Sequence, residues 1–165
     1  MKTLLILDEK NYEGTTQVFE KFAVRGIVRR NGKIAVQQNK EGEFKLLGGG
    51  VEKCETYEDA LKREVREEGG LLVKTNSIKE IGEIIEIRKD IFDPAVKYIC
   101  HSLFYYCDVE DRMVPLEMTD SEVLQGFRMV WVEPEEFVKK NQTIVDKPWM
   151  DRDCRFVQMM IDKEV

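Results

Sequence analysis

Residues 49–71 read GGVEKCETYEDALKREVREEGGL, and this stretch decides the fold of the chain. Its middle part has a helical pattern, because Tyr57, Leu61 and Val65 recur every four residues and form one apolar stripe. The threonine before Tyr57 is a suitable N-cap, and a glycine pair ends the pattern. The stretch therefore predicts an amphipathic helix over about Thr56–Glu68.

Three glutamates of this predicted helix share one face. Glu64, Glu67 and Glu68 stand at positions i, i+3 and i+4, so their carboxylates crowd together and repel one another. A hard divalent cation, Mg²⁺ or Mn²⁺, would relieve the repulsion, because such ions prefer oxygen ligands. The glycine run Gly48–Gly50 lets the backbone approach closely and offers carbonyl oxygens. The pattern therefore predicts a divalent-metal cofactor.

A second pair of charges flanks the helix. Glu55 precedes it and Arg63 lies two turns inside it. An ion pair between them would clamp the glycine run to the helix. We therefore expect Glu55 and Arg63 to form a structural brace.

Segments with strand and helix patterns alternate along the chain, which indicates an α/β or α+β layered domain. The expected strands are Leu4–Leu7, Phe22–Arg29, Lys33–Gln38, Phe44–Leu47, Ile78–Ile87, Tyr98–Val109 and Phe127–Val132. The Asn31–Gly32 pair predicts a tight hairpin. Two more helices are expected, one opening at Pro134 and one over Arg152–Ile161, and Glu110–Ser121 is expected to be a loop.

Length and charge narrow the function classes. The 165 residues suit one domain, 1–165, with a short strand within 1–20 and a helix at about 150–162 as additions. The net charge of −6 makes nucleic acid an unlikely partner, because a general nucleic-acid binder is basic. No apolar run approaches ~18 residues, so a membrane span is not expected. Four cysteines without C-x-x-C spacing favour reduced thiols and a cytoplasmic location.

The stretch at 49–71 resembles a complete Nudix box, G-x5-E-x7-R-E-U-x-E-E-x-G-U, where U is apolar, and it matches all nine defined positions. The resemblance extends in weaker form from about Phe22 to Phe137. It implies a Nudix fold, an α/β/α sandwich with a central mixed β-sheet. It also implies a hydrolase that cleaves the diphosphate linkage of a nucleoside diphosphate joined to another group, a small-molecule substrate.

The resemblance also implies residue roles. It makes four positions metal ligands: Gly49 through its carbonyl, Glu64, Glu67 and Glu68. Family members often use one more acid from a later loop, for which Glu122 is the first candidate and Asp120 and Glu117 are rivals. Either Glu64 or Glu122 would be the general base that accepts a proton from the attacking water. Two positions depart from the family pattern: Leu47 replaces a frequent proline, and Cys54 replaces a frequent glycine.

The sequence indicates less about substrate recognition than about the metal site. Arg25 is a charge among apolar neighbours and is a candidate for holding a phosphate, while the ring of Phe44 is a candidate for stacking on a base. The sequence does not separate a nucleoside triphosphate from ADP-ribose or similar molecules. A non-catalytic sensor of nucleotide derivatives and a divergent chemistry on the same scaffold are alternatives. The apolar residues of Leu4–Leu7 and Phe156–Ile161 are compatible either with a homodimer or with packing on their own sheet.

Overall fold

The computed structural model describes residues 1–144 and 147–165. In these residues the strands are β1 (Thr3–Asp8), β2 (Gln17–Ile27), β3 (Arg29–Arg30), β4 (Lys33–Gln38), β5 (Phe44–Leu46), β6 (Leu71–Val73), β7 (Lys79–Lys89), β8 (Val96–Tyr106), β9 (Val109–Met113) and β10 (Arg128–Val132). The helices are α1 (Tyr57–Gly69), α2 (Asp120–Gln125), α3 (Pro134–Asn141) and α4 (Pro148–Ile161), with one 3₁₀ turn at Thr75–Ser77.

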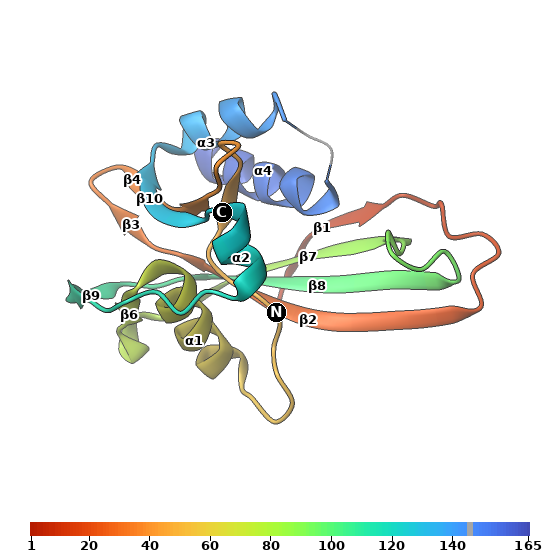
Figure 1. Ribbon diagram of the computed structural model, residues 1–165, viewed down its shortest axis with the longest axis horizontal. Coiled ribbons are helices and arrows are strands. Elements are labelled where there is room, and N and C mark those ends of the chain that lie inside the picture. The colour runs from red at the N-terminus through yellow and green to blue at the C-terminus, as the bar shows by residue number, and fades with distance from the viewer. Residues whose placement is uncertain (145–146) are drawn as a thin grey trace.

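The described strands form two four-stranded sheets, one mixed and one antiparallel, and an antiparallel pair. The mixed sheet has the order β1-β7-β8-β2, in which β1 and β2 run parallel to their neighbours and β7 is antiparallel to β8. A second sheet has the order β10-β4-β3 with β5 paired to β4, and β6 pairs with β9. Helix α1 lies on one side of the strands, and α3 and α4 lie on the other (Figure 1). The predicted α/β/α arrangement with a mixed sheet is confirmed.

Two hydrophobic cores hold the layers together. In the first, Phe104 of β8 stacks on Phe156 of α4 with ring centroids 3.9 Å apart. In the second, Leu61 and Val65 of α1 pack against the other side of the strands. A Cβ atom at Gly26 of β2 would lie 2.5 Å from Cγ2 of Val65, so glycine is needed there for α1 to approach the sheet. This close contact fixes the height of α1 above β2.

The local signals of the sequence correspond to the observed turns and caps. The side chain of Thr56 caps α1 by accepting a hydrogen bond from the backbone N–H of Asp59. Asn31 and Gly32 both have positive φ, 52° and 78°, which is the tight hairpin expected between β3 and β4. The predicted helix over Thr56–Glu68 and the predicted hairpin are therefore confirmed.

Several expected boundaries were wrong, and two of them bear on the site. The segment Glu110–Ser121 is not one loop: β9 pairs with β6 at its start, and α2 begins at Asp120. Helix α2 forms because Thr119 and Glu122 make a capping box, each side chain accepting the backbone N–H of the other. The last helix also begins earlier than expected, at Pro148.

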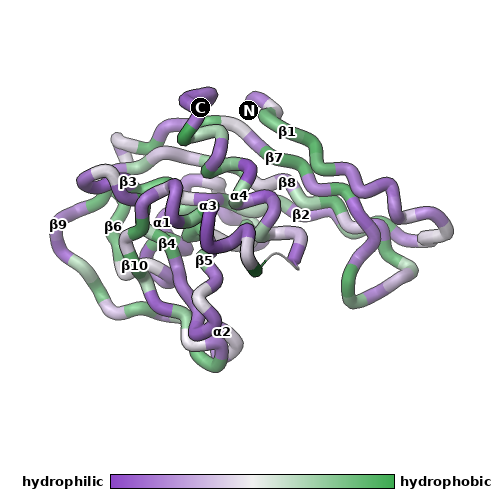
Figure 2. The backbone as a smooth tube through the Cα atoms, turned by 90° about the horizontal axis from the view of Figure 1, so that it is seen from above, coloured by the Kyte–Doolittle hydropathy of each residue, from purple (hydrophilic) through white to green (hydrophobic). Residues whose placement is uncertain are grey.

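The elements at the two ends of the chain belong to the first core. Leu5 and Leu7 of β1 pack against it, and Phe156 and Val157 of α4 are buried within it. Along the tube of Figure 2, β1 is coloured hydrophobic for much of its length and lies beside β7. Packing on their own sheet therefore accounts for most of the apolar residues at both ends.

Candidate active site

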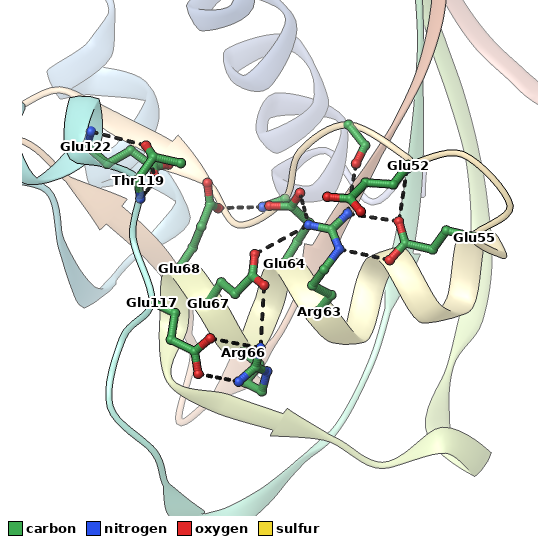
Figure 3. A network of polar contacts seen from close by, with 12 residues as sticks. Glu52, Glu55, Arg63, Glu64, Arg66, Glu67, Glu68, Glu117, Thr119 and Glu122 are labelled. Atoms are coloured by element: carbon green, nitrogen blue, oxygen red, sulfur yellow. Dashed lines mark hydrogen bonds and ion pairs between the residues drawn. The ribbon is translucent and has the colours of Figure 1, made fainter.

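Arg63 joins the glycine loop, which contains Gly48–Gly50, to helix α1. Its Nε and Nη2 donate to the two carboxylate oxygens of Glu55, at 2.8 and 2.9 Å, and Nη2 also donates to the carbonyl of Gly50 at 2.9 Å (Figure 3). Hydrogen bonding by Arg63 holds the pKa of Glu55 below its ordinary value, and the same bond raises the pKa of Arg63. The expected ion pair is present and clamps the loop to the helix.

Two box glutamates within α1, Glu64 and Glu67, also face arginines. Nη1 of Arg63 lies 2.7 Å from Oε1 of Glu64 and 3.4 Å from Oε2 of Glu67. Nη2 of Arg66 lies 3.4 Å from Oε1 of Glu67, and Arg66 also pairs with Glu117. These contacts bring the carboxylates of Glu64 and Glu67 to the side of α1 that faces the glycine loop (Figure 3).

The glycine loop passes directly over Glu64. A Cβ atom at Gly49 would lie 2.5 Å from Oε1 of Glu64, and one at Gly48 would lie 2.0 Å from the carbonyl oxygen of Val24. The carbonyl of Gly49 accepts the backbone N–H of Val24 at 2.9 Å, which ties the loop to β2. A side chain at Gly49 would push the loop away from α1, and a side chain at Gly48 would push it away from β2.

Glu68 points away from this arginine cluster and is buried. Its Oε2 accepts the backbone N–H of Gly48 at 2.7 Å, and its Oε1 accepts from Nζ of Lys45 at 2.6 Å. Burial raises the pKa of Glu68 to about 7 although Lys45 lies beside it. Lys45 comes from β5 and was not singled out by the sequence.

Of the three acids proposed from the later loop, Glu122 lies beside Glu68. Its Oε1 is 3.5 Å from Nζ of Lys45, while its Oε2 accepts the backbone N–H of Thr119 in the cap of α2. Partial burial works to raise the pKa of Glu122, but hydrogen bonds with Thr119 and Glu68 and the charge of Lys45 leave it below its ordinary value. Glu117 instead pairs with Arg66, and Asp120 is exposed at the first turn of α2.

A cavity of about 310 Å³ opens between the glycine loop, β2, β8 and α4. Its wall includes Lys45 and Glu122 together with Arg25, Tyr98 and Trp149. Arg25 is only 7% exposed, and burial lowers its pKa. Its Nη1 donates to a carbonyl of its own strand, and its Nε finds no hydrogen-bond partner among the described residues.

Phe44 does not line this cavity. Its side chain is 4% exposed and its ring stacks on Phe137 in the first core, with centroids 5.8 Å apart. The next residue of β5, Lys45, points to the site because successive residues of a strand face opposite sides. The ring of Phe44 is therefore not in a position to stack on a nucleotide base in the cavity.

Trp149 is the aromatic residue of α4 on the cavity wall. Its Nε1 donates to Oε1 of Glu43 at 3.2 Å, and Nζ of Lys147 lies 2.9 Å from Oε2 of the same carboxylate. The pattern of Pro148 followed by Trp149 marked a helix start, but no sequence signal tied Trp149 to the glycine loop.

The donors on α1 fit a hard divalent cation. Glu64, Glu67 and Glu68 offer only carboxylate oxygens, and Gly49 adds a carbonyl next to Glu64. In residues 1–144 and 147–165, no three acids, histidines or cysteines already form a metal-binding group. Each glutamate instead faces a lysine or arginine, so the chain's own cations stand near the carboxylates.

The chain matches the family model "NUDIX domain" over residues 20–153, which is most of its length. It belongs to the Nudix family. The match includes the whole Nudix box and extends beyond it on both sides, into β2 at one end and into α4 at the other. The predicted family is therefore confirmed, and Trp149 falls within the matched part of this Nudix chain.

Two curated relatives are similar to parts of this Nudix chain. An ADP-ribose pyrophosphatase from Methanocaldococcus jannaschii is 43% identical over 60 residues, which is 34% of this chain and 36% of that protein. A nucleoside triphosphatase, NudI, from Escherichia fergusonii is 29% identical over 108 residues, covering 64% of this chain and 72% of that protein. The first alignment spans only about a third of that relative.

Solved structures with low sequence identity share the Nudix fold. A NUDIX hydrolase from Nitrosomonas europaea has a TM-score of 0.61 at 17% identity, covering 83% of this chain and 87% of that one. The E. coli ORF135 protein has a TM-score of 0.53 at 24% identity, covering 74% and 80%. These likenesses support the fold. In the described part of the chain, no helix is long and apolar enough to cross a membrane.

Proposed function

We propose that this Nudix protein is a metal-dependent hydrolase that cleaves the diphosphate linkage of a nucleoside diphosphate derivative. The observation that carries the proposal is that acidic and basic side chains lie next to each other at the glycine loop. Carboxylates suited to a divalent cation lie on α1, and basic side chains, Lys45 and Arg25 among them, line the adjoining cavity. A diphosphate needs both, because its oxygens bind cations and protein donors together.

The metal, Mg²⁺ or Mn²⁺, would be held by Glu64, Glu67 and Glu68, with the carbonyl of Gly49 as a further ligand. When bound, it would neutralise phosphate oxygens and acidify water. Arg63 bonds to Glu64, so this carboxylate is held in place at the loop. Either Glu64 or Glu122 would accept the proton of the attacking water, and the lowered pKa of Glu122 keeps it ionised for that role at neutral pH.

The substrate enters the cavity with its phosphates at Arg25 and its base or second sugar at the aromatic wall. Arg25 is buried and its Nε has no partner in the described residues, so an anionic oxygen would satisfy it. Tyr98 and Trp149 offer rings to a nucleotide base. Similarity to an ADP-ribose pyrophosphatase and to a nucleoside triphosphatase supports testing both substrate classes first.

The test is a hydrolysis screen of the full chain with Mg²⁺ and with Mn²⁺. Nucleoside triphosphates, ADP-ribose and other nucleoside diphosphate derivatives are supplied one at a time, in water enriched in ¹⁸O. The expected result is metal-dependent release of a nucleoside monophosphate from at least one compound, and the labelled product identifies the phosphorus attacked. Tight binding without turnover across the panel would favour the sensor alternative and overturn the proposal.

Three broader expectations remain proposals beside this one. We propose a single domain over residues 1–165, a cytoplasmic location, and a homodimer as one assembly to test. The described cysteines are free thiols: Cys100, Cys107 and Cys154 are buried and Cys54 is exposed. Sedimentation analysis of the full chain would decide between a monomer and a dimer.

A further inference from the structure

One ammonium group bridges the two acids that face the cavity. Nζ of Lys45 lies 2.6 Å from Oε1 of Glu68 on α1, 3.5 Å from Oε1 of Glu122 on α2, and 3.4 Å from Oε1 of Gln37 on β4. Glu68 is a proposed metal ligand. Glu122 is proposed either as a further metal ligand or as the general base. Lys45 therefore occupies the place between them where a positive charge is needed.

Both oxygens of Glu68 are engaged in this arrangement. Oε2 accepts from the backbone of Gly48, and Oε1 accepts from Lys45, while the residue as a whole is 3% exposed. A buried carboxylate needs a compensating partner, and Lys45 supplies it. A divalent cation that takes Oε1 as a ligand must displace the ammonium, because the two positive charges repel each other at this separation.

The displaced ammonium of Lys45 can move into the adjoining cavity. Lys45 lines the cavity together with Lys21 and Arg25, and its four-carbon stem lets the charge move without moving β5. One buried donor on the cavity wall, Nε of Arg25, has no hydrogen-bond partner among the described residues. Three cationic side chains, one of them with an unsatisfied donor, form a site for an anion with several oxygens, which is the chemistry of a diphosphate.

We propose that Lys45 is an internal counter-ion that couples the two ligands: it neutralises Glu68 until a divalent cation binds, and then moves its ammonium to a phosphate oxygen. The inference rests on the proposed metal site and extends it to a positioning residue. A cation that binds alone takes Glu68, the closer carboxylate partner, from Lys45, whereas a cation that binds with a diphosphate gives Lys45 a new partner. Cation and diphosphate therefore strengthen each other's binding by the same factor.

The experiment measures binding without turnover. Mn²⁺ is titrated into the metal-free full chain at pH 8, with and without methylenediphosphonate, a diphosphate analogue that is not hydrolysed, and bound Mn²⁺ is followed by electron paramagnetic resonance and calorimetry. In the unchanged chain we expect the analogue to tighten Mn²⁺ binding about tenfold or more. In Lys45→Met we expect Mn²⁺ alone to bind severalfold more tightly, and the effect of the analogue to fall below about threefold.

Two further variants make the result specific. Lys53→Met removes an exposed lysine of the loop before α1 and is expected to leave both quantities unchanged. Lys45→Gln keeps a hydrogen-bond donor for Glu68 but no charge, and is expected to follow Lys45→Met. If both Lys45 variants retain the coupling, or bind Mn²⁺ alone no more tightly than the unchanged chain, Lys45 is only a structural bridge and the inference is wrong.

The inference and the proposed function fail in different ways. A chain that couples Mn²⁺ and diphosphonate through Lys45 but hydrolyses nothing keeps the inference and loses the function. A chain that hydrolyses a nucleotide but shows no coupling keeps the function and loses the inference.

Discussion

The two sides of the candidate site are built in different ways. On the α1 side, Arg63 and the groups it contacts lie within residues 50–67, in one helix and the loop before it. On the cavity side, Arg25, Lys45 and Glu122 come from β2, β5 and α2 and meet only when the sheets and helices pack. The first side is positioned by local contacts, and the second depends on the tertiary fold of the whole chain.

The charges on the two sides are also balanced differently. On the α1 side, hydrogen bonds from Arg63 lower the pKa of Glu55, so the ionised pair is stable without any ligand. On the cavity side, burial raises the pKa of Glu68 to about 7 and lowers the pKa of Arg25. The cavity side thus holds charges that a cation and an anion would stabilise, which is the physical argument for ligand binding there.

The largest expected effect comes from removing a carboxylate of the α1 face. Glu67→Gln should lower the turnover of a substrate found in the screen by about 10³-fold, because it removes a proposed metal ligand while keeping the size of the side chain. The measurement is kcat with saturating Mg²⁺. Glu58→Gln, an exposed acid in the first turn of the same helix, is the matched control and should stay within about twofold of the unchanged chain.

A substitution on the cavity side should lower activity less than Glu67→Gln does, and it should change kcat/KM rather than the stability of the fold. Arg25→Met should lower kcat/KM by about 10- to 100-fold, the equivalent of one charged hydrogen bond, without lowering the free energy of unfolding. Stability is retained because the variant removes a buried guanidinium whose Nε is unsatisfied. Arg30→Met, at an exposed arginine of β3, is the control. Equal kinetics in the two variants would show that Arg25 does not bind substrate.

The sequence predicted the α1 side well because its signals are local. The spacing of Glu64, Glu67 and Glu68 places them on one face of any helix, and the expected partner of Glu55 was correct. Arg25, on the cavity side, was also chosen as a candidate, since a charge within an apolar strand is unusual, and it lies on the cavity wall. These residues needed no knowledge of how distant segments pack.

The cavity side was predicted less completely, for physical reasons. In β5 the ring of Phe44 packs in the first core, and one residue reverses the face of a strand, so the side chain that reaches the cavity is that of Lys45. Lys45 and Glu122 are 77 positions apart, and Trp149 is farther still, so no spacing rule connects them. The capping box of Thr119 and Glu122 was a readable signal for α2 that the expected loop overlooked.

On the α1 side, the ion pair between Glu55 and Arg63 should make the free energy of unfolding depend on pH. Folding lowers the pKa of Glu55 below its ordinary value of 4.5, so the pair with Arg63 stabilises the chain above pH 4.5. That contribution is lost as the pH falls through the lowered pKa. Glu55→Gln should therefore cost about 0.5–1 kcal/mol at pH 7 and less below pH 4.5. Urea unfolding at several pH values measures this, and a pH-independent cost would contradict it.

The smallest expected effect concerns the loop before α1, on the α1 side. Cys54 has a φ of 67°, in the left-handed region that a side chain makes unfavourable, and it stands where the family often has glycine. Cys54→Gly relieves this strain but gives the unfolded chain more freedom, so the net gain should be only about 0.5 kcal/mol. Thermal unfolding should show a small rise in Tm with unchanged kcat, since the thiol of Cys54 is exposed to solvent. A fall in kcat would mean that the Cys54 side chain, and not only the backbone around it, helps to hold the loop against α1.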